Sequence, residues 1–241
     1  MATRGLMVEQ PRRPPADEGV AVSRMEQRLP MLLSVIAGMV DVTGFLTLGN
    51  IFTAHITGNI VALAAALGRG GPLNVTQALA IPMFMIAVAA SWLLARVSGR
   101  RGADLARLLL WAQCLLLVGV LTMCVLTNPS THPHGVEAGV AVMIAVSAMA
   151  CQYTLFRIAL PDAVSTAVMT GNLTNTVLSL VDAVSSTKVL MEHSAGTLRQ
   201  SVPILVGFVV GCGVGAASVS VLGEWAWSLP CVLAGAAVVV R

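Results

Sequence analysis

The chain contains six apolar stretches that are long enough, or nearly so, to cross a lipid bilayer as α-helices. They lie at about residues 31–49, 79–97, 105–126, 139–158, 201–222 and 225–240. A helix needs about 20 mainly apolar residues to cross the hydrocarbon core of a membrane, and the last stretch is short by this measure. The pattern predicts an all-α polytopic membrane protein with about six transmembrane helices.

The composition supports the same interpretation. Of 241 residues, 56% are hydrophobic and 10% are charged, whereas a soluble domain carries about 25% charged residues. So few charges cannot keep a surface hydrated, so we expect the lipid bilayer to be the main partner. A net charge of +3 does not indicate nucleic-acid binding, and we expect none.

Two further apolar segments, 51–68 and 162–184, are interrupted by polar residues and share a motif. Thr57-Gly58-Asn59 in the first matches Thr170-Gly171-Asn172 in the second. Flanking features recur in the same order. Thr53 matches Thr166, and Ile81-Pro82 matches Val202-Pro203. Gly38–Asp41 matches Met149–Gln152 if the second half is shifted by two residues. The shared order favours an internal duplication.

The basic residues select a topology in which each Thr-Gly-Asn segment enters and leaves the membrane on one side. With the N-terminus inside, the cluster Arg96–Arg107 is inside, together with Arg157, Lys188, Arg199 and Arg241. The outer loops then hold only Arg69, which satisfies the positive-inside rule. If both segments spanned instead, the cluster would lie outside.

Each half then has three spans and one re-entrant segment, so the two halves form inverted repeats. We expect a disordered cytoplasmic tail at 1–29, a first membrane repeat at 30–126, an external loop at 127–138 and a second repeat at 139–241. The tail is polar and contains Pro11, Pro14 and Pro15, a composition that cannot bury a core. We expect both termini in the cytoplasm.

The residues that could carry chemistry lie in the apolar segments. Asp41 lies in the first span, where an ionisable group is costly and most often functional, although a structural contact between helices is the alternative. Gln152 occupies the matching place in the second half and cannot titrate. His55, just before Thr57, could carry a proton or could simply bond the backbone. We expect Asp41 to face a polar cavity.

The two Thr-Gly-Asn motifs could each begin a half-helix, at Ile60–Leu67 and Leu173–Val184. Asn and Thr are favoured N-cap residues, and the N-terminus of such a helix would present N–H groups and a positive dipole to a solute or ion. The alternative is that Gly58 and Gly171 only permit close packing between the halves. Asn59 and Asn172 are expected to approach each other near the midplane.

Other features indicate packing rather than chemistry. Gly207, Gly211 and Gly215 recur every four residues, which lets helix backbones touch, either within the chain or in a homodimer. The five cysteines fit small buried hydrophobes. His132 and His134 lack a third ligand, so we expect no metal site, no cofactor and no enzyme motif.

The segments Ala37–Asp41 and Phe52–Asn59, with Thr170-Gly171-Asn172, resemble the YoaK family of bacterial membrane proteins, a domain of unknown function. The resemblance covers about residues 30–240 and rests on Gly-x-x-Asp together with His-x-Thr-Gly-Asn. Ala150 departs from it, at a place where the family often has glycine. The resemblance implies a bacterial inner-membrane location and no established activity.

The leading hypothesis for function is a small-solute transporter or channel with its site where the repeats meet. One alternative is a membrane scaffold or assembly factor without catalytic activity, which uses the glycine face as its contact. Another is an intramembrane enzyme that uses Asp41 and His55. The solute itself is not specified by the sequence.

Overall fold

The computed structural model describes residues 16–161, 164–166, 169–185 and 188–240. Within them the chain forms helices and no strands. The helices are α1 (Ala16–Thr47), α2 (Ile56–Gly68), α3 (Val75–Ser98), α4 (Gly102–Thr127), α5 (Val136–Ile158), α6 (Met169–Ser185), α7 (Lys188–Leu222) and α8 (Ser228–Val240), with short 3-10 turns η1 (Pro129–Thr131) and η2 (Gly223–Trp227). The prediction of an all-α chain is confirmed.

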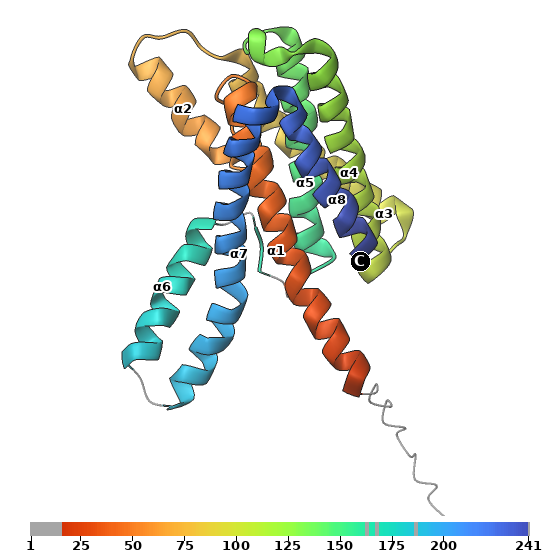
Figure 1. Ribbon diagram of the computed structural model, residues 1–241, viewed down its shortest axis with the longest axis vertical. Helices are drawn as coiled ribbons and strands as arrows, with labels where there is room; N and C mark the ends of the chain where they lie inside the picture. The colour runs from red at the N-terminus through yellow and green to blue at the C-terminus, as the bar shows by residue number, and fades with distance from the viewer. Residues whose placement is uncertain (1–15, 162–163, 167–168, 186–187, 241) are drawn as a thin grey trace, which may run out of the picture.

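Six of these helices run roughly up and down the long axis of the molecule, in alternating directions along the chain (Figure 1). They are α1, α3, α4, α5, α7 and α8, and they match the six predicted apolar stretches. Among the described residues, five stretches are long and apolar enough to span a membrane; the fifth, Gly196–Val240, contains α8 and most of α7. These two helices run antiparallel on either side of η2 (Figure 1), so the fold is that of a polytopic membrane protein.

The distribution of side chains is that of a protein dissolved in lipid. Large apolar side chains such as Met85 on α3 and Val209 on α7 are exposed, whereas Gln113 and Gln152 are buried. In water this arrangement would cost free energy, but an apolar surface is stable against hydrocarbon and polar groups gain from pairing inside.

The two short helices take a different course from the other six. α2 has 13 residues and α6 has 17, both below the length of a full span. α8 is as short, with 13 residues, but it belongs to the apolar stretch Gly196–Val240 that it shares with α7. In Figure 1 each begins near the middle of the long axis, and they then run outwards in opposite directions. α2 packs on α3, and α6 packs on α7.

The glycines of α7 lie directly against α1. A Cβ atom added at Gly211 would collide with the carbonyl oxygen of Val35, and one at Gly215 would lie 3.1 Å from Cα of Met39. Gly38 of α1 is equally close to the backbone of Phe208. Small residues therefore let these two helix backbones touch, and this glycine face is covered within the chain.

The starts of α1, α2 and α6 differ from the sequence expectation. Helix α1 begins at Ala16, inside the stretch 1–29 expected to be a disordered tail, because residues after Pro15 are mostly helix-compatible and continue into the first span. Residues 1–15 lie outside the described residues. Helix α2 begins at Ile56, ahead of Thr57-Gly58-Asn59, and α6 begins at Met169, ahead of Thr170-Gly171-Asn172. Each motif therefore lies in the first turn of its helix and does not cap a helix that starts at Ile60 or Leu173.

Candidate functional site

Asp41 holds the loop that connects α1 to α2. Its Oδ1 accepts hydrogen bonds from the backbone N–H groups of Thr53 and Ala54, both at 2.8 Å, and from that of His55 at 3.3 Å. The residue is 5% exposed. An ionised carboxylate only accepts hydrogen bonds, and three convergent donors suit that form. The carboxylate thus pairs three loop N–H groups that have no partner in a helix, as polar backbone within a membrane requires.

The second oxygen of Asp41 bonds the imidazole of His55. Nδ1 of His55 lies 2.8 Å from Oδ2 of Asp41, so an ionised Asp41 accepts a hydrogen bond from Nδ1–H of the ring. Nε2 is then free to bond another group. The His55 side chain is 33% exposed and its ring meets Phe208 of α7 edge-on, with centroids 5.0 Å apart.

Asn59 closes the same loop from its other end. Its Oδ1 accepts from the N–H of Phe52 at 2.9 Å, and its Nδ2 donates to the carbonyl of Phe52 at 2.7 Å. The residue is fully buried. In the second half, Nδ2 of Asn172 donates to the carbonyl of Ser165 at 2.9 Å. Each asparagine thus bonds the residue seven positions earlier, just before Thr53 or Thr166.

The two motifs also agree in exposure. Thr57 and Thr170 are exposed, Gly58 and Gly171 are half-buried, and both asparagines are buried. A Cβ atom at Gly58 would lie 2.9 Å from the ring of Phe52, so glycine is needed there to let the loop fold onto α2. The threonine hydroxyls are the motif groups left facing outwards.

Gln152 is the centre of a second polar group, on α5. Its Nε2 donates to the carbonyl of Leu33 on α1 and to Oγ1 of Thr166, both at 3.0 Å. Its Oε1 accepts from Nε2 of Gln113 on α4 at 2.7 Å. Gln152 therefore contacts its own half's loop at Thr166, as Asp41 contacts its loop at Thr53.

Tyr153 was not predicted as a site residue, although it is the one tyrosine in the sequence and follows Gln152. Its hydroxyl donates to the carbonyl of Ala54 at 2.8 Å. This bond ties α5 of the second half to the loop that Asp41 organises. The Asp41 loop therefore lies where the two halves of the chain meet.

These groups do not form a metal centre or a disulfide. Among the described residues there is no cluster of three or more His, Cys, Asp or Glu side chains that could hold a metal ion. All five cysteines are free, and four of them are buried. His132 and His134 lie in the loop between α4 and α5.

Among the described residues, five stretches long and apolar enough to span a membrane, two shorter helices with a buried asparagine in the first turn and an apolar surface define an integral membrane protein of the polytopic all-α class. The chain belongs to the family described as "Protein of unknown function (DUF1275)", whose model matches residues 29–240. Over 48 residues it is 50% identical to the UPF0700 transmembrane protein YoaK of Bacillus subtilis (strain 168). That match covers 20% of this chain and 21% of the relative, and no solved structure matches. The family suggested by the motifs is confirmed.

Proposed function

We propose that this protein is a small-solute transporter or channel of the bacterial inner membrane, with its solute path beside the first turns of α2 and α6. The observation that carries the proposal is the pair of short helices that begin near mid-height and run outwards in opposite directions (Figure 1). Helices that break at membrane depth occur where a solute or ion path needs polar backbone.

An inverted repeat is part of the proposal, with α1–α4 corresponding to α5–α8. The packing supports it, because each main contact between two α-helices has a counterpart when the halves are exchanged. The contact of α1 with α7 corresponds to that of α5 with α3, α2 with α3 to α6 with α7, and α4 with α5 to α8 with α1. The contacts of α1 with α5 and of α4 with α8 would then lie on the pseudo-two-fold axis.

The solute path would use the N-terminal ends of the two short helices. Backbone N–H groups there have no partner within their helix, and the helix dipole is positive. Thr57 and Thr170 add exposed hydroxyls in the first turns. Together these groups suit a solute that carries a negative charge or several hydrogen-bond acceptors.

His55 would be the protein's proton-handling group in this path. Asp41 fixes its Nδ1, and its partly exposed ring leaves Nε2 available. Asp41 itself is fully engaged by the loop and His55, so we place its role in orienting the histidine rather than in binding solute. In this proposal the proton is therefore carried by His55 and not by Asp41.

The proposed orientation has both termini in the cytoplasm. At the lower side of Figure 1, α3, α5 and α8 end and α4 begins. These helix ends carry Arg96, Arg101 and Arg157. The opposite ends carry Arg69 alone among the described arginines outside the spans. The positive-inside rule then assigns the arginine-rich side to the cytoplasm.

A scaffold function is the second candidate, because the bonds of Asp41 are all internal and the α1–α7 contact is tight. A screen of solute uptake into proteoliposomes separates the two. Transport predicts a flux that falls in His55→Gln, Thr57→Val and Thr170→Val but not in Thr122→Val, an exposed threonine of α4 that bonds its own helix. A scaffold predicts no flux above protein-free vesicles for any solute.

A further inference from the structure

A cavity of about 310 Å³ lies at the turn between α3 and α4, away from the Asp41 loop. Eight residues line it: Trp92, Ala95, Arg96, Gly99, Arg100, Arg101, Leu105 and Ile158. None of the eight is acidic. Residues of α3, α4 and α5 and of the α3–α4 turn line this pocket, and among the described residues its charged lining groups are all arginines.

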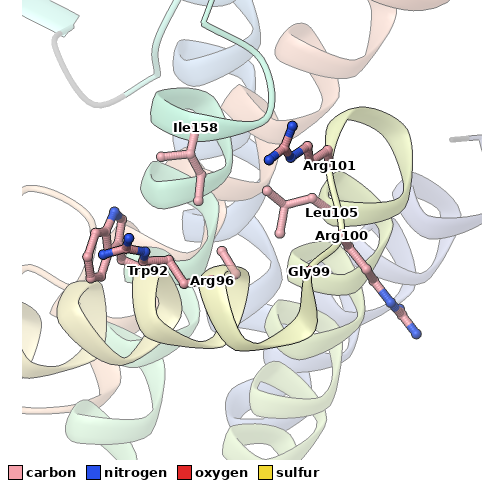
Figure 2. Close-up of a pocket in the computed structure, with 8 residues that line it drawn as sticks. Trp92, Arg96, Gly99, Arg100, Arg101, Leu105 and Ile158 are labelled. Atoms are coloured by element: carbon pink, nitrogen blue, oxygen red, sulfur yellow. The ribbon is translucent and has the colours of Figure 1, made fainter.

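The cavity has a cationic rim and an apolar floor. Figure 2 shows Arg96 beside Trp92 on one side and Arg101 on the other, with Ile158 of α5 between them, whereas Arg100 points away. Ala95 and Leu105 are buried and Ile158 is half-buried. The guanidinium of Arg96 lies 4.7 Å from the centre of the Trp92 ring, which orients it by a cation–π contact.

Among the described residues these arginines have no carboxylate partner. Within the described residues the one ion pair is that between Asp41 and His55. Asp104 lies in the first turn of α4 but does not line the cavity. The N-cap residue of α4 is Arg101, which makes no side-chain capping bond, so the first N–H groups of this helix add to the positive character of the turn.

We propose that this cavity binds the phosphate of an anionic phospholipid. Guanidinium groups match phosphate in geometry and charge, and basic pockets between helices at the membrane edge suit such headgroups. A lipid fits better than free phosphate because the floor is apolar and Leu93, Leu94 and Val97 are exposed on the same end of α3. Trp92, also exposed, is of the type that settles at the membrane interface.

The proposal is independent of transport, since it uses none of the residues around Asp41. It is tested with the full chain in detergent micelles, by measuring the binding of phosphatidylglycerol and of phosphatidylcholine with the same acyl chains. Native mass spectrometry reads out the bound lipid directly. Inorganic phosphate and glycerol 3-phosphate are added as competitors.

We expect phosphatidylglycerol to bind about tenfold more tightly than phosphatidylcholine, and Arg96→Gln and Arg101→Gln each to weaken it by about tenfold. Arg96→Lys, which keeps the charge and loses the planar fork, should give an intermediate loss. Arg69→Gln is the matched control, because this exposed arginine follows α2 at the other end of the molecule. It should leave binding unchanged.

Equal binding of the two lipids, or an equal loss in Arg69→Gln, would overturn the proposal. Displacement of the lipid by millimolar inorganic phosphate or glycerol 3-phosphate would assign the cavity to a soluble phosphate compound and would also overturn it. Thermal unfolding of each variant shows whether it is folded. If Arg96→Gln is not, Arg101→Gln decides, because its side chain lies at the rim away from the Trp92 contact.

Discussion

The carboxylate of Asp41 bonds the imidazole of His55 across 14 residues of chain, with Oδ2 and Nδ1 2.8 Å apart. Its other oxygen accepts from three successive backbone N–H groups, of which the last belongs to His55 itself. One side chain thus sets both the path of the α1–α2 loop and the orientation of the histidine. Removing this side chain should therefore destabilise the α1–α2 loop.

Asp41→Ala is expected to lower the free energy of unfolding by about 3–5 kcal/mol, because three backbone N–H groups and Nδ1 of His55 lose their acceptor. Asp41→Asn keeps an oxygen for those N–H groups, so its cost should be nearer to about 1 kcal/mol. Unfolding in mixed detergent micelles measures both. An equal loss in the two variants would mean that the backbone bonds do not carry the stability.

Asn59→Ala is expected to cost about 2 kcal/mol, since both polar groups of Phe52 lose their partner in a buried place. Asn172→Ala should also destabilise the chain, because this buried asparagine donates to the carbonyl of Ser165. Asn175→Ala, an exposed asparagine on α6, serves as the control and should lie within about 0.5 kcal/mol of the wild type. A similar loss in all three would contradict the capping role.

The α1–α7 contact gives a prediction with a control on the same helix. Gly211→Ala should cost about 1–3 kcal/mol, because the added methyl group meets the carbonyl of Val35 and the helices must separate. Gly213→Ala has open space around the new Cβ atom and should be neutral or stabilising by up to about 1 kcal/mol. Equal effects in the two variants would show that the helices do not touch at Gly211.

The predicted orientation is tested with a thiol reagent that cannot cross the membrane. His132→Cys, in the α4–α5 loop, should react in intact cells, whereas Arg100→Cys, after α3, should react only after the membrane is opened. The five native cysteines are buried or half-buried, so the wild-type chain provides the background. Labelling of residue 132 only from the cytoplasm would contradict the proposed topology.

The long helices could be predicted from the sequence because a membrane imposes a length and an apolar composition on each span. The six expected stretches correspond to α1, α3, α4, α5, α7 and α8. The ends were harder to predict. The start of α1 at Ala16 and of α2 at Ile56 depend on helix propensity and on loop contacts, which leave little trace in hydropathy.

The sequence singled out Asp41 and His55 as candidate residues, but it did not single out Tyr153 or the contacts that these residues make. The cost of a carboxylate at membrane depth singled out Asp41, yet its partners are backbone N–H groups, which every residue except proline has and which give no sequence signal. The cavity at Arg96 and Arg101 could not be predicted, because its apolar wall includes Ile158, more than 50 residues further along the chain. Only the packing of α5 on α3 and α4 brings these residues together.

The central claim is that water and solute reach the first turns of α2 and α6, and it can be tested without knowing the solute. Thr57→Cys and Thr170→Cys are treated in membranes with a small, charged thiol reagent. Val61→Cys and Leu173→Cys, at exposed apolar positions of the same two helices, are the controls for lipid-facing sites. We predict that the two threonine positions react and the two apolar positions do not; no reaction at Thr57 and Thr170 would contradict a solute path at this site.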